Sequence, residues 1–214
     1  RASGVGSPVN FVATSRPGGV SLAQTTVAVS PASVAASRGT PATVTVTARD
    51  RFGNMVPGRT VTLSASGVGN TIAQPAAVTG ANGITTGAIG ATASGVRTIV
   101  ASVDGLTVTQ QPTLLVTAAP ASAVVFTSVP ATAVSGASLA PAPEVGVVDS
   151  LGNRNFTFTG AVTLGLAVNP VSGTLSGTLT RNAIAGFATF PGLALDRAGA
   201  GYVLRSEEHT SELQ

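Results

Sequence analysis

The sequence predicts an all-β fold made of β-sandwich domains in tandem. The first reason is a five-residue motif, here called the repeated phrase, that occurs twice with the same Asp, Gly and Asn. The copies are Asp50-Arg51-Phe52-Gly53-Asn54 and, 99 positions later, Asp149-Ser150-Leu151-Gly152-Asn153. The second reason is the alternation of Thr with aliphatic residues around each copy, which is typical of half-buried strands. Self-similarity at a fixed period indicates a repeated structural unit.

Matching segments flank both copies in the same order. Pro31-Ala32-Ser33 lies upstream of the first copy, and Pro130-Ala131-Thr132 lies upstream of the second at the same spacing. Val61-Thr62-Leu63 follows the first copy, and Val162-Thr163-Leu164 follows the second. A period of about one hundred residues with short strands suits one β-sandwich domain. We therefore expect two such domains.

The first copy is expected to form a complete sandwich. Thr43 to Ala48 alternates with a period of two, and Asp50 then ends the strand because its side chain can bond its own backbone two residues on. Asn82-Gly83 is a hairpin signal, and Asp104-Gly105 offers the last turn. Strands are expected at residues 25–29, 43–48, 60–64, 96–103 and 114–117.

The second copy repeats the opening of the first but not its end. Gly199 to Leu204 corresponds to Gly95 to Val100, and no counterpart of Ala101 to Thr117 follows. We therefore expect a sandwich that lacks its final strand. Such a strand would bury about three or four aliphatic side chains at roughly 1.5–3 kcal/mol each, so this domain should be marginal or unfolded. Strands are expected at residues 124–126, 145–148, 161–168, 173–180, 187–195 and 199–204.

The repeat divides the chain into four parts. Residues 19–118 are the complete domain, and residues 119–204 are the domain without its last strand. Residues 1–18 contain a Val/Phe segment before Pro17, which predicts the terminal strand of a preceding repeat. The alternative is that this segment is the first strand of the domain that follows it. Residues 205–214 form a separate tail.

The tail, Arg205 to Gln214, resembles the translation of a sequencing-library adapter over all ten residues. It holds the only His of the chain and three of the eight acidic residues. We therefore interpret it as non-native and leave it out of the fold prediction. His209 beside Glu208 is accordingly not interpreted as a site.

Composition excludes several classes of function. The chain has no Cys, and its eleven basic residues are all Arg, with a formal net charge of +3. The arginines are dispersed, whereas a nucleic-acid surface needs them clustered on one face. The absence of Cys excludes a disulfide framework and a thiolate site. No apolar run has the length of a membrane-spanning helix, so no membrane insertion is expected in this chain.

No catalytic, cofactor-binding or metal-binding residue is predicted. Without a His outside the tail, a Ser-His-Asp triad and His-metal ligation are not expected. The acidic residues before the tail are interpreted mainly as turn formers. A calcium site between the domains would need several acidic ligands, and the linker Ala118-Ala119-Pro120 supplies none. These five acids are Asp50, Asp104, Glu144, Asp149 and Asp196.

The motifs of the first copy resemble a known family. Together with Asp50 and Gly53-Asn54, the segments Val56-Pro57-Gly58, Val61-Thr62-Leu63 and Ile99 to Val103 are similar to the bacterial immunoglobulin-like repeat of the invasin and intimin group. The second copy resembles a divergent relative from very large bacterial surface proteins. The resemblance implies immunoglobulin-like β-sandwiches, which usually build rigid stalks that hold an adhesive tip away from the cell.

The expected function is therefore a structural spacer in an adhesin-like protein, extracellular or on the bacterial surface, without catalysis or cofactor. Its expected partners are neighbouring immunoglobulin-like repeats of the same chain, with no nucleic acid and an unspecified external ligand. The alternative is a module that binds carbohydrate or a host protein. Another alternative is an accessory domain of a secreted polysaccharide-degrading enzyme.

Overall fold

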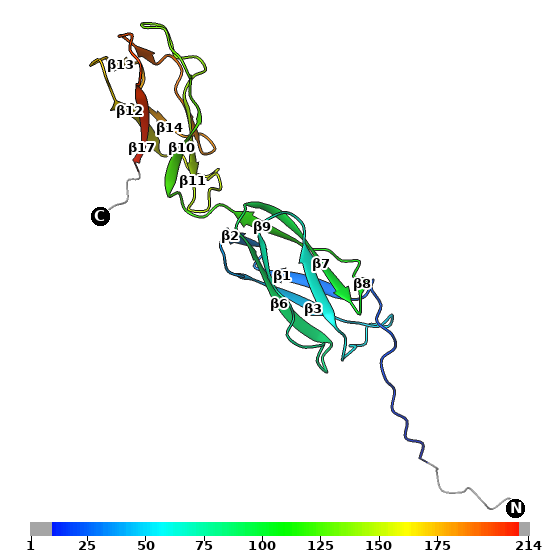
Figure 1. Cartoon of the computed structure of the whole chain (residues 1–214). Helices are drawn as coiled ribbons and strands as arrows, with labels where there is room; N and C mark the ends of the chain where they lie inside the picture. The colour runs from blue at the N-terminus through cyan, green and yellow to red at the C-terminus, as the bar shows by residue number, and fades with distance from the viewer. Residues whose placement is uncertain (1–9, 210–214) are drawn as a thin grey trace, which may run out of the picture.

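A computed structural model describes residues 10–209, which form two β-sandwich domains placed end to end (Figure 1). The first domain contains strands β1 to β9, and the second contains β10 to β17. Each has a hydrophobic core of its own. The described part of the chain contains no helix, so the prediction of an all-β fold is confirmed.

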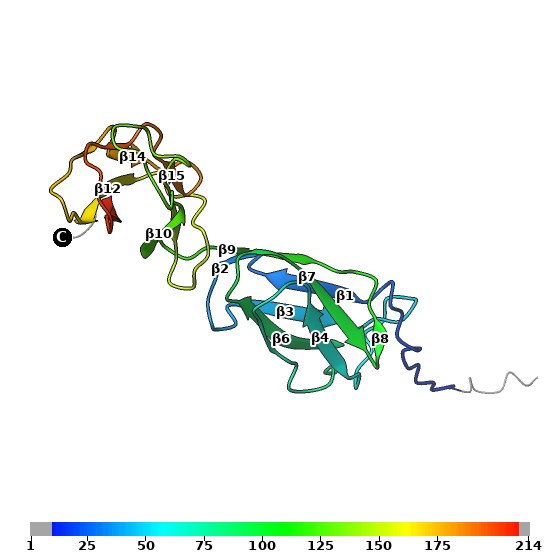
Figure 2. The ribbon, with the colours of Figure 1, turned by 45° about the horizontal axis from the view of Figure 1, so that its top comes forward.

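The first domain packs a four-stranded sheet against a five-stranded one (Figure 2). In the second of these sheets, β2 and β9 run parallel, whereas the other strand pairs are antiparallel. The four-stranded sheet has the order β1 (Thr26–Ser30), β3 (Ala42–Thr47), β6 (Ile84–Ala91), β5 (Asn70–Ala73). The other sheet has the order β2 (Ser33–Ala35), β9 (Thr113–Thr117), β7 (Gly95–Val103), β4 (Val61–Ala65), with β8 (Leu106–Thr107) paired to β7.

Alternation along the strands builds the core of the first domain. In β3, Val44 and Val46 are fully buried, while Thr43 is exposed on the opposite face of the sheet. Ile99 of β7 and Leu114 of β9 fill the core from the facing sheet. Burying an aliphatic side chain of this size contributes roughly 1.5–3 kcal/mol, so these residues supply much of the domain's stability.

One glycine is required by close backbone packing in this domain. A Cβ atom on Gly90 of β6 would overlap the carbonyl oxygen of Gly39. The chain segment before β3 therefore passes directly over β6, and only a hydrogen side chain leaves room for it.

The second domain starts in the same way, but its strands β13 to β16 have only two or three residues each. Its first sheet has the order β10 (Ala123–Ser128), β11 (Glu144–Val148), β15 (Phe187–Thr189). Its second sheet has the order β14 (Thr180–Asn182), β12 (Ala161–Val168), β17 (Val203–His209), and a further pair joins β13 (Leu175–Ser176) to β16 (Ala194–Leu195). Phe190, Leu193 and Leu164 are the largest side chains buried in its core.

Most expected strands are present within a residue or two of their predicted ends, and the differences have physical causes. The expected strand 173–180 is wrong, because only Leu175–Ser176 and Thr180 are extended with a partner. The expected strand 187–195 is interrupted by a turn at Pro191. The expected strand 199–204 is displaced, because β17 spans Val203–His209. The sequence prediction also missed β2, β5, β6 and β8. The pairing of β2 depends on the distant β9, whereas β8 pairs with the adjacent β7.

The predicted correspondence between Gly199 and Gly95 is wrong by one residue. Leu164 pairs with Ser206 as Leu63 pairs with Ala101, so Ala200 takes the place of Gly95. A register shift in β12 between Leu166 and Val168 lies beside this segment. Because side chains alternate between the two faces of a sheet, a shift of one residue in the register changes which side chains point inward.

The first residues do not form the strand that the sequence predicts. Residues 10–18 contain no strand, and residues 1–9 lie outside the described part of the chain. Phe11 and Val12 are 89% and 90% exposed. A β-strand needs a partner for its backbone groups, and within the described residues nothing pairs with this segment.

The exclusion of the tail from the fold is wrong for its first half. β17 continues through His209, and residues 205–209 pair with residues 161–165 of β12. Backbone pairing depends little on the side chains, so polar residues can extend the strand at a sheet edge. Residues 210–214 of the expected tail lie outside the described residues.

We expect Gly90→Ala to destabilise the first domain by about 1–3 kcal/mol, because overpacking of this size forces the backbone to move. Gly19→Ala is the matched control, since a Cβ there meets no atom within 4 Å. The free energy of unfolding is measured by circular dichroism in urea. Equal stability of the two variants would show that the backbone at Gly39 can move away from residue 90 without cost.

We also expect the second domain to unfold at a lower urea concentration than the first. Val134 is 74% exposed and lies in no strand, whereas Val34, at the same place in the sequence repeat, is 8% exposed because β2 pairs with β9 and turns it into the core. Tyr202 is the only tyrosine and the chain has no tryptophan, so fluorescence reports on the second domain alone. A fluorescence midpoint equal to or above that of the remaining β-sheet signal would contradict this expectation.

Candidate functional site

The turn after β3 is organised by a buried carboxylate. Asp50 is 1% exposed, and its Oδ1 accepts hydrogen bonds of 2.9 Å from the backbone N–H groups of Phe52 and Asn54. Its Oδ2 accepts 2.9 Å bonds from Asn54 Nδ2 and from the N–H of Gly18. The expected bond to the backbone two residues on is confirmed. The bond to Gly18 additionally fastens the chain segment that enters the first domain.

The equivalent turn in the second domain repeats this geometry. Asp149 Oδ1 accepts 2.8 Å bonds from the N–H groups of Leu151 and Asn153, and its Oδ2 accepts a 3.0 Å bond from Asn153 Nδ2. The N–H of Ala119 donates to the same Oδ2 at 2.9 Å. Ala119 belongs to the linker between the domains, so each aspartate holds both its own turn and the chain segment entering its domain.

These hydrogen bonds favour the charged form of both carboxyl groups. The Asn54 side chain and then the Gly18 N–H lower the pKa of Asp50 from 3.8 to about 2. Burial raises the pKa of Asp149, but the bonds from Asn153 and from the Ala119 N–H outweigh it, so its pKa is also lowered. Both side chains are therefore anionic acceptors at neutral pH and unsuited to proton transfer there.

Asn153 connects the turn of the second domain to the end of the first. Its Nδ2 donates to the carbonyl of Thr92 at 2.8 Å, and its Oδ1 accepts from the N–H of Ser94 at 2.9 Å. Both ends of the amide are thus bonded to the loop between β6 and β7. On the linker side, Asn155 Nδ2 donates to the carbonyl of Ala119 at 3.1 Å.

Arg97 holds the loop that receives Asn153. The residue is 4% exposed, and its guanidinium donates to Asn70 Oδ1 at 2.8 Å and to the carbonyls of Val68 and Ala93 at 3.1 and 2.5 Å. Ala93 lies between the two residues that Asn153 contacts. The buried cation therefore fixes the geometry of that loop through carbonyl oxygens, with no carboxylate bonded to it.

Apolar contacts complete this joint. Leu151, at the tip of the second turn, packs against the core cluster of the first domain. Beside it is a cavity of about 510 Å³, lined from the first domain by Leu115 and Val116 and from the second by Phe156. The Arg154 guanidinium lies 3.8 Å from the Phe156 ring centre and 4.2 Å from that of Phe187, which holds Phe156 in place.

The acidic residues that the sequence singled out do not converge. Asp104, at the turn between β7 and β8, forms an ion pair of 3.3 Å with Arg59. Glu144 accepts bonds from the hydroxyls of Thr127 and Thr189, and Asp196 accepts one from the N–H of Thr174. Within residues 10–209, no three His, Cys, Asp or Glu side chains gather where a metal could bind.

Sequence reasoning identified the two aspartate turns but missed the joint. The roles of Asn153 and Arg97 depend on a contact between domains, which no local pattern reveals. The available signal was the Asn that ends both copies of the repeated phrase, although the same side chain also bonds the aspartate of its own turn.

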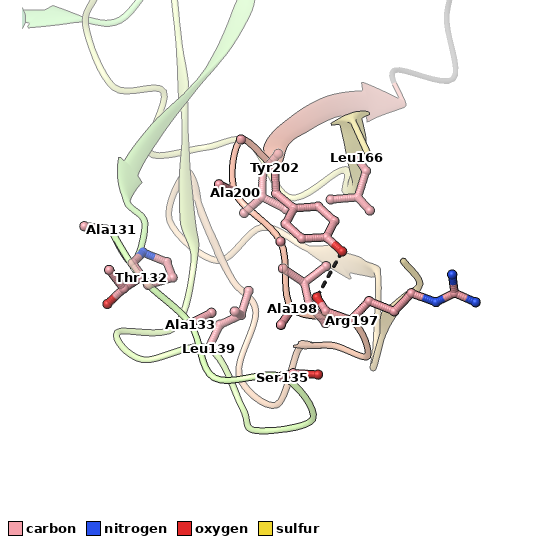
Figure 3. Close-up of a pocket in the computed structure, with 15 residues that line it drawn as sticks. Ala131, Thr132, Ala133, Ser135, Leu139, Leu166, Arg197, Ala198, Ala200 and Tyr202 are labelled. Atoms are coloured by element: carbon pink, nitrogen blue, oxygen red, sulfur yellow. Dashed lines mark hydrogen bonds between the residues drawn. The ribbon is translucent and has the colours of Figure 1, made fainter. Parts of the chain in front are cut away.

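A second cavity, of about 430 Å³, lies in the second domain between residues 130–135 and 198–204 (Figure 3). Ala131, Ala133 and Leu139 line one side, and Leu166 and the Tyr202 ring line the other. The Tyr202 hydroxyl donates to the carbonyl of Arg197 at 3.0 Å. Its lining is mainly aliphatic, and Arg197 is its only permanently charged residue.

The arrangement of two sandwiches with paired turns defines a class of protein, the immunoglobulin-like repeat. Residues 24–117 match the family described as bacterial Ig-like domain (group 1). The first domain is therefore similar to bacterial immunoglobulin-like domains of this group, and the predicted resemblance to the invasin and intimin type is confirmed.

Solved structures share this fold. Invasin, described as a bacterial integrin-binding protein, aligns with a TM-score of 0.53 at 17% identity over 88% of this chain and 40% of its own. The Escherichia coli adhesin FdeC aligns with a TM-score of 0.50 at 19% identity over 87% of this chain and 65% of its own. This chain thus spans less than two thirds of either structure.

No protein of curated function matches the sequence. Within residues 10–209, no helix is long and apolar enough to cross a membrane.

We expect the stability of the first domain to fall as the pH drops from about 4 to about 2. The folded pKa of Asp50 lies below its ordinary value of 3.8, so its contribution is full above pH 4 and is lost as the pH falls through about 2. Urea unfolding followed by circular dichroism between pH 5 and pH 2 measures this. Asp50→Asn should flatten the dependence, and an unchanged slope in that variant would contradict the assignment.

Proposed function

We propose that this chain is a structural spacer from a bacterial adhesin-like protein, outside the cell or on its surface, without catalytic activity. The observation that carries the proposal is the joint between the domains. Asp149 fastens the linker at Ala119, while Asn153 bonds the loop of the preceding domain. Two domains that are bonded and packed at their junction resist bending, which is what a stalk requires.

The contacts in the joint are directional. Three hydrogen bonds of 2.8 to 2.9 Å join the turn of the second domain to the first domain and to the linker. Leu151 adds burial against the first core. A flexible connection would leave these groups to water, so their mutual satisfaction supports a preferred angle between the domains.

The first domain carries the same contact surface at the end where Gly18 enters it. Phe52 and Asn54 correspond to Leu151 and Asn153, and Phe52 is 73% exposed. Asn54 bonds only Asp50 among the described residues, whereas Asn153 also reaches the preceding domain. These two residues are suited to receive another immunoglobulin-like repeat, which supports neighbouring repeats as the partners of this chain.

The alternative is a module that binds carbohydrate or a host protein. It would need a cluster of exposed aromatic or charged groups, but the exposed Phe52 and Phe156 lie in separate turns, each stacked with an arginine. An accessory role beside a polysaccharide-degrading enzyme has no distinguishing feature in these domains. Glycan-array binding that is abolished by loop substitutions would favour the alternative over the spacer.

We expect Asn153→Ala to loosen the angle between the domains. It removes two hydrogen bonds between domains, worth about 1 kcal/mol each, so the undocked population should rise roughly tenfold or more. The chain has no Cys, so spin labels can be attached at Leu106→Cys and Ile184→Cys, whose native side chains are 62% and 81% exposed. Double electron–electron resonance then measures the distribution of distances between the two labels.

Asn54→Ala is the matched control. It removes the same bond to the turn aspartate, but in a turn on which no domain is seated within residues 10–209. The distribution between the two labels should stay narrow in this variant. A broad distribution in the unsubstituted chain, or equal broadening by both substitutions, would rule out a stiff joint of this kind.

A further inference from the structure

Strand β4 lies at the edge of its sheet in the first domain. Within residues 10–209, the only strand that pairs with it is β7. The N–H of Ser66, directly after β4, donates to the carbonyl of Thr98 at 3.0 Å, so the even-numbered positions face β7. Backbone groups of successive residues point to opposite sides of a strand. The residues whose N–H and carbonyl groups face away from β7 are therefore Val61, Leu63 and Ala65.

The side chain of Gln74 occupies this edge. Its Oε1 accepts the N–H of Leu63 at 2.7 Å, and its Nε2 donates to the carbonyl of the same residue at 2.7 Å. At the end of β4, Asn70 Nδ2 donates to the carbonyl of Ala65 at 3.3 Å. A neighbouring strand would offer Leu63 one acceptor and one donor in the same way. The amide of Gln74, here called the cap, therefore stands in the place of a peptide group.

The second domain shows that a strand fits at the equivalent edge. Leu164 of β12 takes the position of Leu63, by the pairing of β12 with β17 and of β4 with β7. Its N–H donates to the backbone carbonyl of Leu179 at 2.8 Å, and β14 continues the pairing along β12. In the first domain, the segment after β5 stays beside β6 instead, where the Thr85 hydroxyl donates to the Ala77 carbonyl at 2.8 Å.

Close packing places the cap at the edge of β4. β5 pairs with β6 up to Ala73, and a Cβ atom on Gly87 of β6 would overlap both the carbonyl oxygen of Ala73 and the side chain of Leu63. The missing side chain at Gly87 therefore lets the end of β5 approach β4. Pro75 then restricts the backbone of Gln74 to an extended conformation. The amide thus starts from a fixed point when it bonds Leu63.

The sequence of β4 carries none of the usual guards against pairing. Exposed edges are commonly protected by charged side chains, proline or bulges, whereas β4 reads Val-Thr-Leu-Ser-Ala and keeps a continuous register with β7. The side chains of Thr62 and Ser64 are exposed and uncharged. In a two-fold antiparallel pairing about Leu63, Val61 would face Ala65 of a second copy, so all three outward residues would bond.

We propose that the edge of β4 is a strand-pairing surface for a second copy of this chain, and that the amide of Gln74 keeps it closed. With the cap in place, the N–H and the carbonyl of Leu63 are both engaged, and copies that lie side by side do not join through this sheet. Without the cap, two β4 strands pair about Leu63 and form one continuous sheet. The proposal concerns the first domain and is independent of the spacer function.

The cap is tested in the full chain by amide hydrogen exchange, followed by NMR at low protein concentration. Gln74→Ala should speed the exchange of the Leu63 amide at least about tenfold, because the acceptor of its hydrogen bond is lost. The Leu164 amide, whose acceptor is a backbone carbonyl of the second domain, should change less than about threefold. Unchanged exchange at Leu63 would overturn the proposal.

Sedimentation velocity over a range of concentrations tests the pairing. Gln74→Ala should form a dimer with an association constant at least about tenfold above that of the unsubstituted chain. Gln74→Lys removes the same two bonds but adds a charge at the edge, so it should stay monomeric. Gln24→Ala, which shortens an exposed glutamine before β1, is the matched control.

The Leu63 amide should regain its protection in the Gln74→Ala dimer, which distinguishes pairing at β4 from contact through another surface. A Gln74→Ala chain that stays monomeric although its Leu63 amide exchanges fast would show that the cap blocks nothing. Equal association of Gln74→Ala and Gln74→Lys would attribute the dimer to a loosened domain and not to an opened edge. Either of these two results overturns the proposal.

Discussion

The architecture depends on one interaction, the capture of a backbone N–H from the incoming chain by a buried aspartate. Asp50 holds Gly18 in this way, and Asp149 holds Ala119 with the same oxygen and the same 2.9 Å length. The carboxylate is already fixed by the hydrogen bonds of its own turn, so its bond holds the incoming segment at Gly18 or Ala119 in a defined position. Because the aspartate lies at the entry of a domain, this short-range bond sets where one sandwich stands relative to the next.

The joint shows how buried polar groups can specify an arrangement. Asn153 has its amide bonded to both Thr92 and Ser94, and Arg97 has its guanidinium bonded to the carbonyl of Ala93 in the same loop and to that of Val68. Separating the domains would break both bonds of Asn153, whereas the bonds of Arg97 lie within the first domain and would remain. Leu151 adds apolar area but could slide, so the polar contacts define the angle.

The sequence predicts a large part of this fold, and the limits of the prediction are physical. Alternation at Thr43 to Ala48 and the turn chemistry of Asp50 are local, so β3 and its turn are predictable. The pairing of β2 with β9 joins residues about eighty positions apart, and only three-dimensional packing reveals it. The same holds for Asn153, whose partners lie in another domain. Leaving the tail out of the fold prediction was wrong for residues 205–209, because the edge of β12 can pair with almost any backbone.

The parallel pairing of β2 with β9 has a mechanical consequence when the chain is placed under tension. The chain enters the first domain through β1, continues into β2 and leaves it after β9, so tension that reaches β2 pulls these two neighbouring strands in opposite directions along their length. Their hydrogen bonds lie across that direction and are loaded together as a shear, not opened one at a time like a zipper. A domain threaded in this way withstands stretching better than its modest core alone would suggest.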